Sequence, residues 1–274
     1  MLRWGVPRLP LSVEPIPLDL AYNDPEANLK ALEEAVAARL SAHPEIAPEE
    51  RLFLFPELTL TAFVTKAPLA FSLSPADATV GAVAALAKKF HTGLAVGFPE
   101  KPAGGGKPLN ALAVFAPGGL AGVYRKNHLF TLGASPESAA YSAGDGGVLL
   151  DYRGWRVGLA VCFDVRFSAL FHAYAKAGAD LILVSSCWVG GPHKTEQYRT
   201  LTSTHAILTQ SYVAAVNRSG RDPVWEYDGS AYVFSPFGEN LHKGGPVRLD
   251  PAELDACRKL AVRVADRPSY PIKG

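Results

Sequence analysis

The chain has 274 residues, of which 48% are hydrophobic and 19% are charged. A composition this apolar excludes a disordered protein, and a chain of this length can bury a large core without disulfides. Lysine and arginine number 27 against 26 aspartates and glutamates, a formal net charge of +1, so no basic excess indicates binding to nucleic acid or to an anionic membrane.

The cysteine content favours a reducing compartment. Cys162, Cys187 and Cys257 are too few for a disulfide-built secreted fold and too far apart for a zinc knuckle. Early prolines interrupt any apolar signal region, and no stretch approaches the ~18 apolar residues of a membrane span. We therefore expect a cytoplasmic protein that forms a single domain over residues 1–274.

The first half of the chain predicts helices and strands in alternation. An Asp-Pro pair at 24–25 is typical of a helix start, and apolar residues every three or four positions extend that helix to His43. The apolar run 52–55 predicts a strand buried on both faces. A second helix over 80–90 and a second buried strand over 94–98 repeat the unit.

The second half repeats this alternation and adds two hairpins. The elements expected there are strand 157–161, helix 169–176, strand 181–184, helix 198–208 and strand 212–216. Segments 111–115 and 119–124 are typical of an antiparallel hairpin, as are 232–235 and the strand after Gly238. We therefore expect an α/β protein with mixed sheets covered by helices.

Three reactive side chains follow buried strands, where open α/β folds bind their ligands. Glu57 follows the run 52–55, Lys126 ends a strand of the first hairpin, and Cys162 follows strand 157–161. Singly, each is also explained as a solvated turn residue or, for the cysteine, as a small core residue. Together they indicate nucleophilic catalysis, because a thiol needs a base or a cation beside it to react at neutral pH.

The sequence around these residues resembles a known family. The strings FPEL at 55–58, YRKNHLF at 124–130 and VCFDVRF at 161–167 resemble, in that order, the three signature motifs of the nitrilase superfamily, the carbon–nitrogen hydrolases. The resemblance continues through GAD at 178–180 and VNRSG at 216–220, so it covers nearly the whole chain.

The resemblance implies a four-layer αββα sandwich with two mixed sheets and a Glu-Lys-Cys triad. By motif, Glu57 is the general base, Lys126 the oxyanion-stabilising cation and Cys162 the nucleophile. The backbone N–H of Phe163 would be a second oxyanion donor, worth roughly 10²–10³ in rate. Glu137 matches a second glutamate of the family that positions the substrate. No cofactor and no metal is implied.

The sequence departs from the family pattern at three positions. Ser168 replaces a common proline, and His205 replaces a usual arginine that would form an ion pair on the active-site side. Ala62 lies near a position where glycine is more common. None of these departures removes a member of the triad, but they prevent transfer of a subfamily's substrate specificity.

Other candidate residues carry weaker signals. Cys187 and Trp188 follow a strand and are expected to line the substrate pocket, whereas Cys257 is expected to be structural. A Cys-His arrangement or a metal site has little support because no pair of histidines shows ligand spacing. The histidines considered are His128, which borders the lysine motif, His172, His193 and His205.

We expect hydrolysis of a small aliphatic amide through a cysteine thioester, releasing ammonia or an amine. The alternatives are a nitrilase, an N-carbamoyl amide hydrolase, or a non-catalytic binding module on the same fold. We also expect a homodimer or an assembly of dimers, because helices 169–176 and 198–208 carry few charged residues and would leave an exposed apolar patch. In a monomer, the tail 263–274 would have to cover that patch.

Overall fold

The computed structural model describes residues 7–64, 66, 68–74, 76–131 and 136–260. Its first sheet has six strands in the order β13-β1-β2-β3-β4-β5. These are β1 (Ser12–Pro15), β2 (Arg51–Leu54), β3 (Gly93–Glu100), β4 (Leu109–Ala116), β5 (Gly119–Arg125) and β13 (Val247–Arg248). Strands β1, β2 and β3 run parallel, and the flanking strands run antiparallel to their neighbours, so the sheet is mixed.

The second sheet has five strands in the order β12-β9-β8-β7-β6. These are β6 (Leu149–Tyr152), β7 (Trp155–Val161), β8 (Leu181–Ser186), β9 (Tyr212–Asn217) and β12 (Ala231–Phe234). Its three central strands run parallel and both edge strands run antiparallel, so it is mixed as well. A separate two-stranded hairpin joins β10 (Ser219–Arg221) to β11 (Glu226–Asp228).

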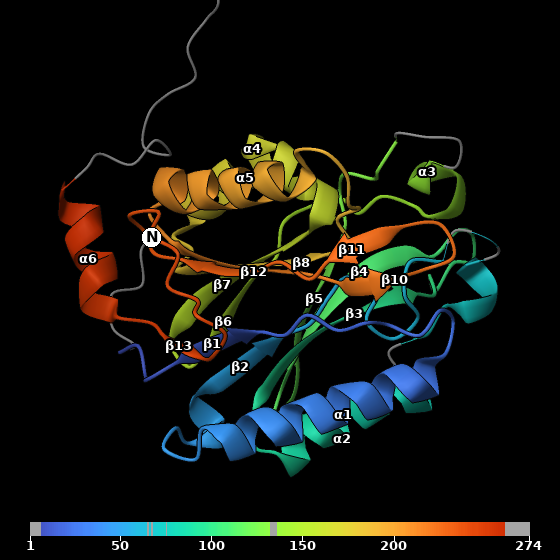
Figure 1. Cartoon of the computed structure of the whole chain (residues 1–274), viewed down its shortest axis with the longest axis horizontal. Helices are drawn as coiled ribbons and strands as arrows, with labels where there is room; N and C mark the ends of the chain where they lie inside the picture. The colour runs from blue at the N-terminus through green and yellow to red at the C-terminus, as the bar shows by residue number, and fades with distance from the viewer. Residues whose placement is uncertain (1–6, 65, 67, 75, 132–135, 261–274) are drawn as a thin grey trace, which may run out of the picture.

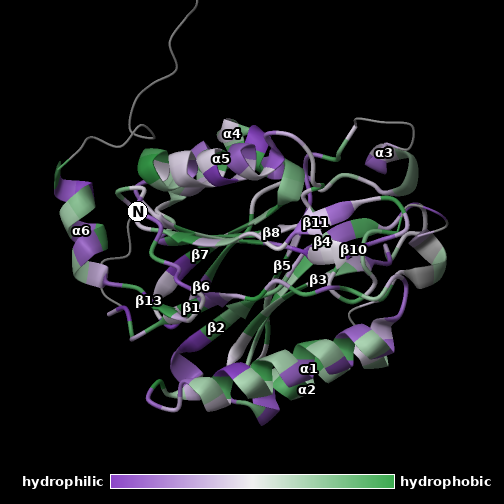
Figure 2. Cartoon of the chain, in the orientation of Figure 1, coloured by the Kyte–Doolittle hydropathy of each residue, from purple (hydrophilic) through white to green (hydrophobic). Residues whose placement is uncertain are grey.

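The two sheets lie between two helical layers (Figure 1). Helices α1 (Pro25–Ala42) and α2 (Ala78–Lys89) cover the first sheet, and α4 (Ser168–Ala177) and α5 (Lys194–Thr209) cover the second. Figure 2 shows hydrophobic colour concentrated on the strands and hydrophilic patches on the helices. The short helix α3 (Glu137–Ala140) and helix α6 (Pro251–Leu260) lie at opposite ends of the molecule. The expected four-layer αββα sandwich is thus confirmed.

Both faces of strand β2 are covered, which explains why the run 52–55 is apolar. Leu52 and Leu54 join the core between the two sheets, whereas Phe53, with Phe55 just beyond the strand, joins the core beneath α1 and α2. Successive side chains of a strand point to opposite faces, and here both faces are covered. Asp24 caps α1 by accepting a hydrogen bond from Ala27 N at 3.0 Å, as the Asp-Pro pair predicts.

Two details of the expected structure need correction. The first hairpin forms as β4 and β5. The second is shorter than expected: β12 pairs with β9, and the segment after Gly238 joins the end of β12 through an isolated bridge between Phe234 and Asn240 and two backbone hydrogen bonds. Helix α4 does not expose large apolar side chains, because Leu170, Phe171 and Tyr174 are all buried. A strand inside a sheet forms hydrogen bonds along both of its edges, so β9 pairs with β8 on one side and with β12 on the other.

The remaining expectations concern the exposed apolar surface of α5, the position of the tail 263–274 and the absence of a membrane span. Exposed apolar surface lies at the end of α5, where Ile207 is 50% exposed and Leu208 is also exposed. The tail 263–274 lies outside the described residues. None of the described helices is long and apolar enough to cross a membrane.

Candidate active site

Strand direction brings the three reactive side chains to one edge of the sandwich. Glu57 lies beyond β2, and Cys162 and Cys187 directly follow β7 and β8. Strand β5 is antiparallel to β4, which is antiparallel to β3, so β5 runs in the direction of β3 and delivers Lys126 to the same edge. Asn110 reaches this edge from the start of β4, the strand that runs the other way.

The turn that carries Glu57 is pressed against β3. Thr59 Oγ1 donates to the carbonyl of Pro56 and accepts from Gly97 N at 3.2 Å. A Cβ at Gly97 would lie 2.5 Å from Leu58 N, so only glycine allows this close approach. Leu58 itself adopts φ = 50°. The backbone below the carboxylate is therefore held in one place.

Both carboxylate oxygens of Glu57 accept hydrogen bonds from buried donors. Oε1 accepts from Asn110 Nδ2 at 2.7 Å and from Lys126 Nζ at 2.8 Å. Oε2 accepts from the backbone N–H of Cys187 at 2.7 Å. Because a carboxylate oxygen has two lone pairs, Oε1 is fully engaged and Oε2 retains one free acceptor direction.

Glu137 lies behind Lys126. Its Oε2 accepts from Lys126 Nζ at 2.8 Å and from Phe130 N at 2.8 Å, and its Oε1 accepts from Asn110 Nδ2 at 2.9 Å. Burial opposes the charge on Lys126, but Glu137 and Glu57 outweigh it and raise the pKa of the lysine well above its usual value. Glu137 is fully buried and its carboxylate contacts Lys126, Asn110 and the backbone of Phe130, whereas the family resemblance implies a substrate-positioning role.

Cys162 begins the short 3-10 helix Cys162–Arg166 directly after β7, with φ = 46°. A non-glycine residue in this left-handed region marks a sharp strand-to-helix turn, which is typical of a presented nucleophile. Burial, and then the negative charge of Glu57, raise the pKa of the Cys162 thiol well above its usual value. A thiol with a raised pKa needs a base to take its proton before it can act as a nucleophile.

Two side chains fasten this turn to the rest of the fold. Asp164 accepts from Tyr124 OH at 2.7 Å, from Val161 N at 2.9 Å and from both the backbone and Nδ1 of His128. His205 Nε2 lies 2.8 Å from the carbonyl oxygen of Val165. His128 and His205 thus support the turn of Cys162. His205 occupies the position of the missing arginine with a hydrogen bond in place of an ion pair.

A cavity of about 430 Å³ opens above this cluster. Glu57, Lys126 and Cys162 line it from buried positions. The other residues that line it are Tyr22, Phe63, Lys66, Phe130, Phe163, Arg166, Cys187, Trp188, Val189, Lys194, Asp222, Pro223, Val224 and Trp225. Of the residues singled out in the sequence, Phe163, Cys187 and Trp188 therefore lie at the cavity, whereas Glu137 is not among its lining residues.

Sequence reasoning missed Asn110 and the segment 222–225. Asn110 is fully buried, and its single amide group donates to both glutamates while its Oδ1 has no partner among the described residues. A lone asparagine at the start of an apolar strand gives no sequence signal for such a role.

Cys257 lies buried in α6, away from the cavity residues. Among the described residues, no three His, Cys, Asp or Glu side chains are grouped to hold a metal ion.

Comparisons with known proteins match most of the chain. The family model for carbon–nitrogen hydrolases matches residues 14–249. Hydrolase Rv0480c of Mycobacterium tuberculosis is 31% identical over 257 residues, 88% of each chain. An (R)-stereoselective amidase of a Pseudomonas species is 30% identical over 238 residues, 83% of each chain.

Solved structures share the fold at lower identity. XC1258 from Xanthomonas campestris, a CN-hydrolase superfamily protein, superimposes with a TM-score of 0.83 at 22% identity and covers 97% of this chain and 100% of its own. Nit3 of Saccharomyces cerevisiae, a member of the nitrilase superfamily, gives a TM-score of 0.80 at 22% identity, over 91% and 93% of the two chains.

Proposed function

Because the chain belongs to the carbon–nitrogen hydrolase family, we propose that it hydrolyses the amide C–N bond of a small molecule, with Cys162 as nucleophile. The observation that carries the proposal is the buried ion pair of Glu57 and Lys126, 2.8 Å apart, in the cavity that Cys162 also lines. A carboxylate and an ammonium group beside a thiol form the set that acyl transfer through a thioester requires.

In the first half-reaction, Glu57 Oε2 takes the thiol proton as Cys162 Sγ attacks the carbonyl carbon. Lys126 Nζ and the backbone N–H of Phe163 stabilise the oxyanion that forms. The intermediate collapses when the C–N bond breaks and the leaving nitrogen takes the proton from Glu57. Ammonia or an amine departs and a thioester remains on Cys162.

In the second half-reaction, Glu57 takes a proton from water as the water oxygen attacks the thioester carbon. The C–S bond breaks, the carboxylic acid leaves, and the sulfur regains its proton. The raised pKa of Cys162 supports this assignment, since a neutral thiol needs a base at the moment of attack. No step calls for a cofactor.

The direct test is a panel of amides, carbamoyl compounds and nitriles scored for released ammonia. We expect release from primary amides and its loss in Cys162→Ala. Release from nitriles alone would favour the nitrilase alternative, and release from carbamoyl compounds alone would favour the carbamoyl hydrolase. No release from any compound would leave the non-catalytic binding module.

A dimer in the cytoplasm is part of the same proposal. Ile207, Leu208 and Phe237 are exposed apolar side chains, and the side chain of Ile207 lies close to Gly238 beside Phe237. A two-fold contact through this surface would bury them. Three free, buried cysteines fit a reducing compartment. Light scattering at micromolar concentration should give about twice 29.2 kDa, and the mass of one chain would contradict the dimer.

A further inference from the structure

The cavity has a buried reactive floor and an exposed apolar rim. Glu57, Lys126 and Cys162 are almost inaccessible, whereas Val224 is 72% exposed and Trp225 is 43% exposed at the same cavity. An amide that reaches Cys162 must therefore extend any larger group from the floor toward the rim. The chemistry of the walls indicates which group fits.

The rim is a fixed turn between β10 and β11. Asp222 Oδ1 accepts from Val224 N and from Trp225 N, each at 2.7 Å, and Asp222 N donates to the carbonyl of Trp225 at 2.9 Å. Tyr227 OH donates to Asp222 Oδ2 at 2.6 Å, and the buried Arg218 lies 3.6 Å from that oxygen. The backbone is thus determined by buried polar contacts, while the two apolar side chains remain in solvent.

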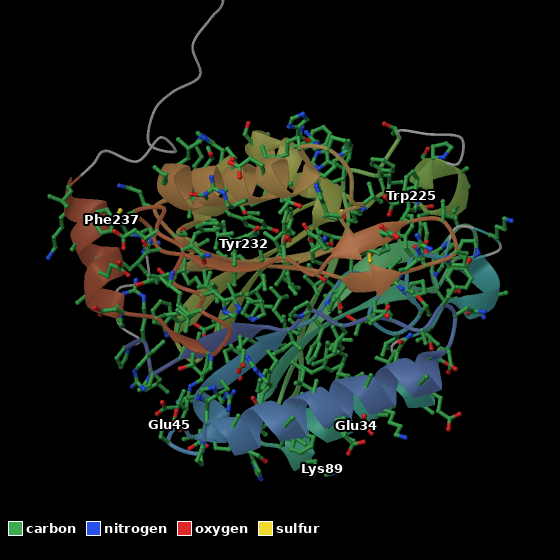
Figure 3. All side chains as sticks on the ribbon, viewed as in Figure 1. Glu34, Glu45, Lys89, Trp225, Tyr232 and Phe237 are labelled. Atoms are coloured by element: carbon green, nitrogen blue, oxygen red, sulfur yellow. The ribbon has the colours of Figure 1, made fainter. Side chains whose placement is uncertain are left out.

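The hairpin is also tied to the wall of the cavity. Gly190 N donates to the carbonyl of Glu226 at 2.8 Å. Asn217 donates to Asp228 Oδ1 at 2.8 Å and accepts from the backbone N–H of Trp188 at 2.7 Å. Figure 3 shows Trp225 at the end of the molecule that carries α3, far from Phe237 at the opposite end. The exposed tryptophan is therefore part of the site and not of the core.

Aromatic side chains continue from the rim to the floor. Phe130 and Phe163 form an edge-to-face pair with ring centroids 5.5 Å apart, and Phe63, Tyr22 and Trp188 also line the cavity. A volume of about 430 Å³ lies within the ~300–1,000 Å³ range of sites for drug-sized ligands. A two- or three-carbon amide would leave most of this apolar space to water, which costs free energy.

Two of the cations that line the cavity, Arg166 and Lys194, are already engaged with one of these rings, and a third, Lys66, is exposed to solvent. Arg166 Cζ lies 4.8 Å and Lys194 Nζ 5.8 Å from the ring centroid of Trp188, and Arg166 also donates to Gln197 at 2.7 Å. Their charge is partly satisfied without a ligand. Most of the cavity surface is apolar, and only an apolar ligand group would remove it from water.

We propose that the substrate is a primary amide with a bulky, uncharged apolar acyl group, such as an arylalkyl chain, that contacts Phe130, Phe163 and Trp225. This inference rests on the proposed amide hydrolysis and names its substrate class. It differs from the small aliphatic amide expected from the sequence. The carbonyl carbon lies at Cys162, and the apolar group extends along the aromatic walls to the rim.

The test compares propionamide with 3-phenylpropionamide, which differ only by the phenyl group, and adds succinamic acid as an anionic amide. We expect kcat/KM for 3-phenylpropionamide to exceed that for propionamide by at least about ten-fold. Burial of a phenyl ring against apolar walls tightens a complex by about ten-fold or more. Equal values for the two neutral amides, or a higher value for succinamic acid, would overturn the inference and leave amide hydrolysis intact.

Two variants test whether the side chain of Trp225 contacts the apolar group of the substrate. Trp225→Ala should lower kcat/KM for 3-phenylpropionamide at least about five-fold more than for propionamide, mainly through KM. Leu120→Ala removes an apolar side chain that is 48% exposed but lies away from the cavity, so both values should stay unchanged. An equal fall for both amides in Trp225→Ala would contradict the contact.

A binding measurement separates this inference from the proposed function. Calorimetry with Cys162→Ala should detect 3-phenylpropionamide and not propionamide, even if no compound releases ammonia from the unmodified protein. That result would contradict the proposed amide hydrolysis and support the apolar binding site. Absence of binding by 3-phenylpropionamide would overturn the apolar site.

Discussion

Two clusters of buried charge lie in the first sheet, and they are built in opposite ways. In the first, which we call the catalytic cluster, Glu57 and Glu137 share the single ammonium of Lys126. In the second, the arginine cluster, Glu14 on β1 is paired with Arg51 on β2 and with Arg39 on α1. All three glutamates are almost completely buried.

The difference lies in the sign of the surplus charge and in its access to a ligand. The arginine cluster gives each oxygen of Glu14 its own guanidinium, and Arg39 is partly open to water. The catalytic cluster has one more carboxylate than cations and faces the cavity through Glu57 and Lys126. A buried carboxylate paired with two guanidinium groups supports the fold, whereas a cluster with surplus negative charge beside a thiol can accept a proton.

The largest expected effect comes from breaking the arginine cluster. Glu14→Gln would leave the fully buried Arg51 without its counter-charge and should lower the free energy of unfolding by about 3–5 kcal/mol. Urea denaturation measures this loss. Glu33→Gln, which breaks the exposed ion pair with Lys89, should cost under about 1 kcal/mol. A similar loss in both variants would contradict the structural role of Glu14.

Breaking the catalytic cluster should affect turnover more than folding. Glu57→Gln keeps the shape of the side chain and removes the proposed base, and Lys126→Ala removes the proposed oxyanion cation. Each should lower turnover at least ~10²-fold, with the circular dichroism spectrum retained. In Glu57→Gln, Glu137 still pairs with Lys126, so the loss of stability should be smaller than in Glu14→Gln. Near-normal turnover in either variant would refute the assigned roles.

A finer change to the catalytic cluster removes only Asn110. Asn110→Leu deletes an N–H donor to each glutamate and so loosens the position of the Glu57 carboxylate. We therefore expect kcat/KM to fall about ten-fold, the loss that one hydrogen bond of about 1.4 kcal/mol predicts. Thr92→Val removes a buried hydrogen bond to the carbonyl of Arg51, away from the site, and should leave kcat/KM unchanged. An unchanged kcat/KM in Asn110→Leu would make Asn110 a purely structural residue.

The smallest effect concerns the order in which the cysteines react. Iodoacetamide at neutral pH should alkylate Cys162 first, because the Cys187 thiol donates to the carbonyl of Glu57 at 3.2 Å and the Cys257 thiol to the carbonyl of Pro236 at 3.6 Å, away from the cavity. Burial raises the pKa of Cys162, so its alkylation should accelerate as the pH rises above neutrality. Peptide mapping that finds Cys187 or Cys257 modified first would contradict the choice of nucleophile.

Much of the fold could be predicted from local sequence. The helix start at Asp24, the buried run 52–55 and the β4–β5 hairpin all formed as expected, because each depends on neighbours a few residues away. The pairing of β12 could not be predicted in this way. Its partner, β9, lies earlier in the chain across a separate hairpin, and the choice depends on which sheet edge is open.

The residues of the site also differ in whether the sequence could indicate them. Glu57, Lys126 and Cys162 could be singled out in the sequence because each is a reactive side chain at the end of an apolar run, within a recognisable motif. Asn110 could not, since its role depends on two glutamates 53 and 27 residues away. Trp225 could not either, because its exposure at the cavity depends on how Asp222 and Arg218 hold the turn.

The sequence by itself determined the family, the layered α/β architecture and the residues able to act as base, cation and nucleophile. These depend on side-chain type and on hydrophobic periodicity, which are local properties of a chain. The tertiary structure alone decided which oxygen of Glu57 keeps a free acceptor direction, which carboxylate lies behind Lys126 and which aromatic side chains face the cavity. Those features arise where strands distant in the chain meet at one edge, and short-range pattern carries no information about such contacts.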